Sequence, residues 1–475
     1  MFDIIKRSFV LVFVLALLCA CSSPQAQSNG SQQSESQSGA STEASNAAGP
    51  KHIDFEQGTL PVMRINVNED TGPTIEQMHA SPNHSVECTG TADLVVADKT
   101  SFGYGASQES LTNMELEYIR GRGHSTWVAP KKAYKLKFKD KQGFFGMEKS
   151  KHWVLLANAY DSSLVRNRLV NWLARRMDMD CVMQDVPVDL VMNGEYLGSY
   201  VLCEHVRIGK GRVDIDELTA QDTDPQVITG GYLISLFPDD DEPKESIFTT
   251  SRYTDVLFEN PSFCPVNGGE EDYANDAQRD YICSYLQRTE DAIFGAGDAP
   301  YTSYIDARSF ADAWLLQAFT CNGDAFTSTS NYLYKERGGK LVWGPLWDFD
   351  LSFNLEHRKA LDEECLYVPR MHWLDKLRED KEYHALLVER WKKLDAALEE
   401  VVRPGGVLDS YRDEMSASWG NDCAVWGDAY ETSIFGDHLS SYEKEIEDLR
   451  EWIEQRRPWM AEQVGKTGVF YHPQP

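Results

Sequence analysis

Carboxylate and carboxamide side chains gather in one stretch of the second half of the chain. Asn322-Gly323-Asp324 is followed by Asn331-Tyr332-Leu333-Tyr334 and then by Trp347-Asp348-Phe349-Asp350. Hard divalent cations take oxygen ligands of this kind, and Mg²⁺ typically combines one or two carboxylates with substrate phosphates. The stretch therefore predicts a site for a metal ion and a phosphate-bearing ligand.

Basic residues that could bind such a ligand lie in the first half. Arg122 stands between Gly121 and Gly123, where the backbone can approach a ligand closely and a guanidinium can contact its oxygens. Residues 133–138 alternate like a strand, with apolar side chains on one face and Lys135 and Lys137 on the other. A phosphate pocket fits this pattern, and so does an ordinary turn followed by a solvated strand face.

The first half of the chain, which carries the basic residues, is predicted to consist mainly of strands. Short β-rich runs with turn signals predict strands over residues 60–67, 92–97, 133–138, 153–157 and 230–236. Residues 186–192 and 196–202 flank Asn193-Gly194, a strong hairpin signal. Asp161, Ser162 or Ser163 is expected to cap a helix that follows.

Later segments are predominantly helical. Residues 310–319 are apolar nearly all round and predict a buried helix directly before the carboxylate stretch. A hairpin is expected for residues 332–334 and 341–343. Amphipathic helices are expected beyond Glu379, the last with a stripe formed by Ile446, Leu449, Trp452 and Ile453.

The N-terminal segment resembles a secretory signal. Lys6 and Arg7 precede an apolar run over residues 9–18, which is too short to span a bilayer. Leu18-Cys19-Ala20-Cys21 resembles a bacterial lipobox, so residues 1–21 are expected to be a signal peptide with Cys21 lipidated. Residues 22–51, rich in Ser and Gln, predict a disordered tether. The protein is therefore expected outside the cytoplasm, lipid-anchored to the bacterial cell membrane.

Charge and cysteine content narrow the function classes. The formal net charge of −29 disfavours wholesale nucleic-acid binding, which needs basic surface. Eight cysteines besides Cys19 and Cys21 show no CxxC spacing, which argues against a zinc ribbon and leaves disulfide pairing open. Hydrolase signatures such as GxSxG and HExxH, and a Walker loop, are missing from the sequence.

Nine short motifs, taken in order, resemble the CotH kinase family, the spore-coat-type atypical protein kinases. The resemblance covers roughly residues 52–465. The nine motifs are residues 120–127, 131–137, 153–158, 164–167, 193–198, 230–233, 322–324, 331–334 and 347–350. The chain departs from the family pattern at His124, Leu346 and Asn354. None of these departures removes a presumed metal ligand.

The resemblance implies an α+β, divergent two-lobed protein-kinase-like fold that binds ATP and Mg²⁺. A β-rich lobe over residues 52–208 and a mainly helical lobe over residues 209–475 would form one catalytic domain. The implied activity is transfer of the ATP γ-phosphoryl group to Ser or Thr of an extracytoplasmic protein, whose identity the sequence does not give.

Individual roles follow from the same resemblance. In the first half, Lys137 and Arg122 would contact the ATP phosphates, and the backbone of residues Glu204 to Val206 would meet adenine. In the second half, Asp324 would be the general base or orienter and Asp348 would hold Mg²⁺. Asn331 and Asp350 would be further ligands or would support them. Sequence alone does not decide how Asp324 and Asp348 divide these catalytic roles.

Two alternatives belong to other function classes. A surface scaffold or adhesion protein could keep the kinase-like fold without turnover, because ATP is scarce outside the cytoplasm. A glycosyltransferase could use Asp348-Phe349-Asp350 to hold a metal and a sugar nucleotide, but the chain has no evident parallel βαβ nucleotide domain.

Overall fold

The computed structural model describes residues 51–97, 107–123, 125–239, 242–263, 273–326, 330–353, 355, 371–433, 439 and 441–466. Contacts separate Met1–Asn46 from a compact unit, Ala47–Pro475, which contains all of these residues. The predicted signal peptide and Cys21 lie outside the described residues, as does all of the tether except Lys51. No helix in the described ranges combines the length and apolar character that crossing a membrane requires.

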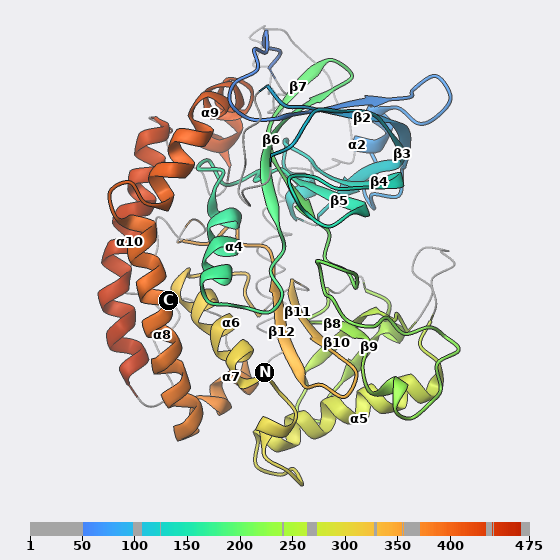
Figure 1. The fold of residues 1–475 in the computed structure, drawn as a ribbon, viewed down its shortest axis with the longest axis vertical. Coiled ribbons are helices and arrows are strands. Elements are labelled where there is room, and N and C mark those ends of the chain that lie inside the picture. The colour runs from blue at the N-terminus through green and yellow to red at the C-terminus, as the bar shows by residue number, and fades with distance from the viewer. Residues whose placement is uncertain are drawn as a thin grey trace, which may run out of the picture. The chain divides into compact units, whose positions relative to one another are not determined.

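A closed barrel forms the first part of the described unit (Figure 1). Its strands are ordered β1-β2-β3-β4-β5-β7-β6, and β6 pairs in parallel with β1 to close it. The bounds are β1 Val62–Val67, β2 Cys88–Val95, β3 Leu111–Arg122, β4 Ala133–Gln142, β5 Ser150–Leu156, β6 Asp185–Met192 and β7 Glu195–Glu204. The connections carry α2 Ile75–His79, α3 Ser125–Val128 and α4 Arg166–Arg176.

The alternating pattern of β4 places its apolar side chains inside the barrel, as the sequence predicts. Tyr134, Leu136 and Phe138 of β4 are buried, while Lys135 and Lys137 between them are partly exposed on the outer face. The predicted hairpin is confirmed, because β6 and β7 pair across Asn193 and Gly194, both with positive φ. Closure removes the unpaired edges that an open sheet would expose.

A second sheet and the longer helices form the rest of the unit. The sheet order is β12-β11-β8-β10-β9, with β8 Tyr232–Leu236, β9 Ile247–Thr249, β10 Asp255–Asn260, β11 Asn331–Lys335 and β12 Leu341–Leu346. The helices are α5 Asp276–Ile293, α6 Ala307–Phe319, α7 His372–Leu377, α8 Lys381–Val402, α9 Val407–Thr432 and α10 Tyr442–Gly465. Single 3₁₀ turns cover Val227–Thr229, Lys244–Ser246 and Tyr301–Ser303.

The fold is mixed α+β, as predicted, and the second half carries more strand than expected. The β11–β12 hairpin and β8 match predicted segments, whereas β9 and β10 were not predicted. Helix α6 is buried on every side, as its composition indicates, because it packs between β12, α8 and α4. In Figure 1 the helices α8, α9 and α10 run beside one another along one side of this unit.

Gly121 of β3 has a packing role in the structure. A Cβ there would lie 2.3 Å from Cη2 of Trp127, whose indole Nε1 donates to the carbonyl of Ser81 at 3.0 Å. The glycine is therefore required by the Trp127 ring. Gly123 has a φ of +95°, which a residue with a side chain rarely adopts.

The predicted cap of the helix after β5 is wrong. Helix α4 begins at Arg166, and its N-cap, Val165, makes no side-chain cap bond. The Asp161 carboxylate instead accepts from the backbone N–H groups of Ser163 and Arg166, each at 3.0 Å. Its hydrogen bonds therefore stabilise the turn that precedes the helix, so the helix starts several residues later than its polar residues suggest.

A buried ion pair attaches α9 to the barrel. Lys131 Nζ donates to Asp422 Oδ1 at 2.6 Å and to the Ser199 carbonyl at 2.8 Å. The same Asp422 oxygen accepts from the Ser199 N–H at 2.7 Å, and a Cβ at Gly198 would come within 2.4 Å of it. Lys131 thus has a structural role, unlike the partly exposed lysines of β4.

Asp189 of β6 makes a second buried contact between the barrel and α9. Its carboxyl group has a raised pKa. Burial raises its pKa to about 6, although Ser418, Ser199 and Tyr196 all donate to the carboxylate. The unfolded value is about 3.9, so the folded state binds more protons between about pH 4 and pH 6. Stability from this group is full below about pH 4 and is lost as pH rises through 6, by about 3 kcal/mol.

Asp189→Asn is therefore expected to be more stable than the native protein at pH 7, by about 1–3 kcal/mol, and to equal it near pH 4. Urea unfolding across this pH range, with Ser199 and Ser418 unchanged, measures the difference. A stability difference that stays constant with pH would show that Asp189 does not titrate in this range.

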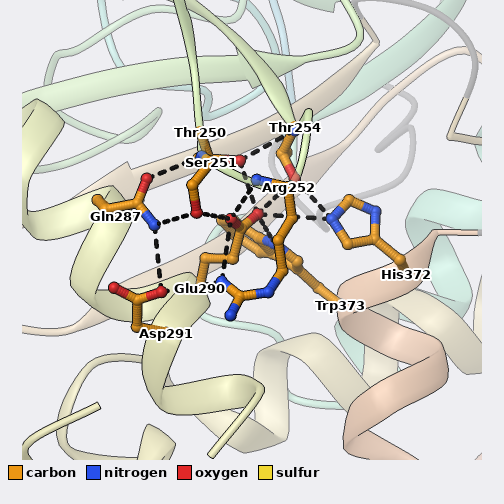
Figure 2. Close-up of polar contacts among 9 residues, drawn as sticks. All are labelled: Thr250, Ser251, Arg252, Thr254, Gln287, Glu290, Asp291, His372 and Trp373. Carbon is orange, nitrogen blue, oxygen red and sulfur yellow. Dashed lines mark hydrogen bonds and ion pairs between the residues drawn. The ribbon is translucent and has the colours of Figure 1, made fainter. Parts of the chain in front are cut away.

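A third buried carboxylate, Glu290 of α5, connects three separate elements (Figure 2). It accepts hydrogen bonds from Thr250 Oγ1 at 2.6 Å, from Trp373 Nε1 at 2.9 Å and from the Arg252 N–H at 2.9 Å. Burial alone would raise the pKa of Glu290, but hydrogen bonds from His372, Thr250, Trp373 and Thr254 outweigh it and hold the pKa well below its usual value. The cluster therefore stabilises the contact of α5 with α7 and the β9–β10 turn.

In the part of the chain that the structure describes, six cysteines carry thiols rather than disulfides, namely Cys88, Cys181, Cys203, Cys283, Cys321 and Cys423. Cys264 and Cys365 lie outside the described residues. Burial raises the thiol pKa at Cys88, Cys181, Cys203, Cys283 and Cys423, which disfavours the reactive thiolate form.

Candidate active site

A cavity of about 30 Å³ lies between the outer face of the barrel and the segment that follows β12. Arg122 and Ala133 line it from β3 and β4, and Asn158 and Asn167 line it from the segment around the start of α4. Its acidic wall is formed by residues 347–350. Nucleotide sites are typically hundreds of Å³ in volume, so the cavity as it stands holds an ion or small group.

Asp348 and Asp350 bring two carboxylates to this wall. Asp348 has a φ of +69°, and its Oδ2 accepts from Ser330 Oγ at 3.0 Å. Asp350 is only 7 % exposed. Burial, followed by the charges of Asp348, Asp161 and Asp324, raises the pKa of Asp350 well above its ordinary value. The four carboxylates therefore form one electrostatic cluster in which a cation would relieve repulsion.

Side chains from α4 hold the acidic loop in place. Asn167 Oδ1 accepts from the Phe349 N–H at 2.7 Å, and its Nδ2 donates to Asn158 Oδ1 at 3.2 Å. Arg166 Nε donates to the Ser352 carbonyl at 3.0 Å. Both ends of the loop are thus bonded to adjacent residues at the start of α4.

Arg166 is itself held by a buried ion pair. Its Nη1 donates to Asp161 Oδ1, and Ser163 Oγ donates to the same oxygen at 2.5 Å. Asp161 and Arg166 are both buried. A buried charge is costly unless it is paired, so these two residues depend on each other.

Left-handed backbone occurs at four positions in the segments that line the cavity or adjoin its lining. Asn158, Leu164, Asp348 and Phe353 have φ values of +47°, +61°, +69° and +54°. Such a conformation costs about 1–3 kcal/mol for an ordinary residue and persists only where the surroundings impose it. Strain of this kind is typical of sites where side-chain direction matters more than local stability.

Asp324, Asn331 and Asn322 are not among the residues that line the cavity. Asp324 is exposed in the turn after α6 and raises the pKa of Asp350 through its charge. Asn331 is buried at the first position of β11, opposite Leu346 of β12. Asn322 Nδ2 donates to the Asp348 carbonyl at 3.2 Å, while its buried Oδ1 has no hydrogen-bond partner among the described residues.

Arg122 of β3 lines the same cavity as Asp348 and Asp350. Its guanidinium stacks over the Trp347 ring at 5.6 Å, and within the described residues it has no carboxylate partner. A guanidinium that lines a cavity without such a partner can bind a phosphate.

Lys137 lies further from the acidic wall. Its Nζ contacts Glu117 Oε1 at 2.7 Å, and it does not line the cavity. Lys135 shares the outer face of β4 and is two residues, about 7 Å, closer to the end at Ala133 that does line it. The structure thus brings Arg122, Asp348 and Asp350 together in one cavity and does not bring Lys137 there.

The predicted adenine-contacting residues lie at the end of β7. The Glu204 N–H donates to the Gln184 carbonyl at 3.0 Å, so the sheet already uses this donor. Its side chain is buried beside Arg212, and burial raises the pKa of Glu204 to about 7. Val206 is partly buried against the cluster of Val154, Cys203 and Tyr334.

The donor set fits Mg²⁺ in part. Asp348 and Asp350 supply two carboxylates to the lining of the cavity. Mg²⁺ characteristically completes its coordination with water and substrate phosphates, so two protein carboxylates suffice. No three His, Cys, Asp or Glu side chains among the described residues already converge as a metal cage.

Comparison with protein families finds one family model that matches most of the chain. The family model described as CotH kinase protein matches residues 119–460, from the end of β3 to within α10. The chain belongs to the CotH kinase family. The matched segment contains the cavity, Arg122 and the four clustered carboxylates, and a kinase-like function follows from the membership. A search of curated proteins finds no match.

Sequence reasoning missed Asp161, Arg166 and Asn167 as parts of the site in this CotH-family protein. The sequence pattern around Asp161 predicts a helix cap, and residues 164–167 belong to one of the motifs that resemble the family. The signal that could have revealed them is this motif. It places an arginine and an asparagine at adjacent positions, and neither belongs to the apolar face of α4.

Proposed function

We propose that this CotH-family chain is an atypical protein kinase. It transfers the ATP γ-phosphoryl group to Ser or Thr of extracytoplasmic proteins and needs Mg²⁺. The observation that carries the proposal is the cavity that Asp348, Asp350 and Arg122 line together, because phosphoryl transfer depends on carboxylates that hold the metal and cations that bind the phosphates. The predicted two-lobed kinase arrangement belongs to the same proposal.

The residues take separate roles in this proposal. Asp348 and Asp350 would hold Mg²⁺, which neutralises charge on the phosphates. Arg122 orients the phosphates from the barrel. Asp324 is exposed and can accept a hydrogen bond from an acceptor hydroxyl that enters from solvent. Asn167 and Arg166 keep the carboxylates aimed by fixing their loop.

The small cavity supports one competing function. A volume of about 30 Å³ is far below what a nucleotide occupies, and Lys137 is engaged with Glu117. A kinase-like scaffold without turnover would have these features permanently. An active enzyme would instead widen the cavity when ATP binds.

Thermal unfolding separates these functions. For a kinase, Mg²⁺ and ATP together are expected to raise the melting temperature, by an amount that follows the ligand concentration relative to Kd. Transfer of labelled phosphate to protein is expected under the same conditions. A UDP-sugar serves as the control ligand, and stabilisation by it without stabilisation by ATP would favour a glycosyltransferase.

If neither ligand stabilises the protein and no phosphate is transferred, the scaffold function would be favoured. Stabilisation by ATP without transfer would indicate a nucleotide-binding protein that has lost turnover. The kinase proposal requires both effects.

The proposed location rests on the N-terminal sequence. Lipidation of Cys21 and a tether up to residue 51 would place the kinase outside the cytoplasmic membrane, where it would meet exported acceptors. Mass spectrometry of the purified mature protein is expected to find a diacylglyceryl group on an N-terminal Cys21.

A further inference from the structure

Three asparagines, Asn158, Asn167 and Asn171, line the same cavity as the acidic wall. The protein already uses two of their carboxamide oxygens. Asn158 Oδ1 accepts from Asn167 Nδ2 at 3.2 Å, and Asn167 Oδ1 accepts from the Phe349 N–H at 2.7 Å. Asn171 Oδ1 accepts no hydrogen bond within the described residues, and its side chain is partly exposed. Asn171 therefore brings to the cavity lining an oxygen that remains available to a ligand.

The orientation of the Asn171 carboxamide is fixed by a buried carboxylate. Asn171 Nδ2 donates to Asp185 Oδ2 at 2.7 Å, and Asp185 is buried at the start of β6. An ionised carboxylate only accepts hydrogen bonds, so the amide must present its NH₂ group to Asp185. The opposite orientation would put two oxygens in contact without a proton between them. Asn171 Oδ1 is therefore the atom of this amide that is turned away from Asp185.

Arg168 holds Asp185 in this role from outside the cavity. Its Nε lies 3.3 Å from Asp185 Oδ1, and both side chains are buried, so the carboxylate has a fixed counter-charge. Arg168 Nη1 also donates to Glu414 Oε2 of α9 at 2.9 Å, and its guanidinium lies over the Tyr411 ring at 4.5 Å. Side chains from α4, β6 and α9 thus fix one carboxamide, an arrangement typical of groups that support a metal ligand.

Helical spacing places Asn171 close to the acidic wall. Asn167 and Asn171 are four residues apart in α4, so they share a face of the helix and their Cβ atoms are about 6 Å apart. Asn167 is bonded directly to the backbone of Phe349, which separates Asp348 from Asp350. With a cavity of about 30 Å³ between the groups that line it, a single ion is the kind of ligand that the carboxylates and Asn171 can share.

We propose that Asn171 Oδ1 is a third protein ligand of the cation that Asp348 and Asp350 hold. The inference rests on the proposed function for the presence of that cation, and it does not depend on turnover. Two carboxylates and a carboxamide oxygen are the hard donors that Mg²⁺ and Mn²⁺ take. Asp185 and Arg168 are positioning residues, because they act on the cation only through Asn171.

Binding of Mn²⁺ without nucleotide tests this ligand apart from catalysis. Free Mn²⁺ gives an electron paramagnetic resonance signal that is largely lost when the ion binds, so titration of the full chain measures its affinity. The chain has many surface carboxylates, and the relevant binding is the part that Asp348→Asn removes and Asp428→Asn retains. Asp428 is exposed and pairs with Lys51 at 2.6 Å.

Two substitutions at Asn171 separate a ligand from a structural group. Asn171→Ala removes the oxygen and the N–H donor together, and it is expected to weaken this binding at least about tenfold while keeping the helix, since alanine favours helices. Asn171→Asp also removes the donor to Asp185 but keeps an oxygen ligand and adds charge. It is expected to bind Mn²⁺ at least as tightly as the native protein, because affinity rises with ligand charge. Its metal-free form is expected to melt at a lower temperature, because two carboxylates then adjoin.

Equal losses of Mn²⁺ affinity in both variants would overturn the proposal, because Asn171 would then act only through its bond to Asp185. Unchanged affinity in Asn171→Ala would overturn it without need of the second variant. If the native protein shows no Mn²⁺ binding that Asp348→Asn removes, the metal site of the proposed function fails together with this ligand. Affinity that Asn171→Ala lowers and Asn171→Asp restores supports the ligand even if no phosphate is transferred, and only the kinase proposal would then fall.

Discussion

Replacing Asp348 with asparagine is expected to reduce Mg²⁺-dependent phosphoryl transfer by about 10³-fold or more, with little change in stability. The loss follows because the neutral side chain no longer supplies negative charge to the metal, and phosphoryl transfer depends almost entirely on positioning and charge. Stability is retained because the Ser330 hydroxyl can still donate to the asparagine oxygen. Labelled-phosphate transfer and urea unfolding measure the two effects.

Asp428→Asn is a matched control. Asp428 is an exposed carboxylate that pairs with Lys51 at 2.6 Å, so removing its charge tests whether any acidic residue matters. Its transfer rate is expected to equal that of the native protein. Undiminished transfer in Asp348→Asn would remove Asp348 from the metal site.

Replacing Arg166 with methionine is expected to lower the free energy of unfolding by about 3–5 kcal/mol and to reduce transfer as well. The change leaves the Asp161 carboxylate buried without its cation, which is the costly half of a broken buried pair. It also removes the hydrogen bond to the Ser352 carbonyl, so the loop that carries Asp348 and Asp350 loses one of its two attachments to α4.

Arg176→Met provides the comparison. Arg176 also lies in α4, but it pairs with Glu400 at the surface, where an ion pair contributes about 0–1 kcal/mol. Unfolding in urea should therefore rank the two variants clearly. If both variants lose a similar free energy of unfolding, the buried position of Arg166 and its pair with Asp161 would have no special effect on stability.

Local pattern predicted most of the elements correctly. The Asn193-Gly194 hairpin, the alternating β4 and the buried α6 each follow from a few adjacent residues, so sequence alone reveals them. Closure of the barrel was not predicted, because it depends on the parallel pairing of β1 with β6, whose residues lie more than a hundred positions apart.

The site residues also separate into those that local sequence predicts and those that depend on distant contacts. The carboxylates were predictable from residue type, and the structure places Asp348 and Asp350 in one cavity with Arg122. The choice of lysine was not predictable in this way, because Lys135 and Lys137 occupy the same strand face and only the neighbouring strand assigns Glu117 to Lys137. The importance of Arg166 and Asn167 depends on hydrogen bonds to a loop more than 180 positions later.

The most direct test of the central claim is the position of the cation. A crystal of the protein grown with Mn²⁺ in place of Mg²⁺ and a non-hydrolysable ATP analogue would show the ion by its anomalous scattering. The proposal predicts one strong peak within about 2.2 Å of a carboxylate oxygen of Asp348 or Asp350, with a phosphate oxygen on its other side and Arg122 beside the phosphates. An ion bound elsewhere, or an analogue seated away from this cavity, would contradict it.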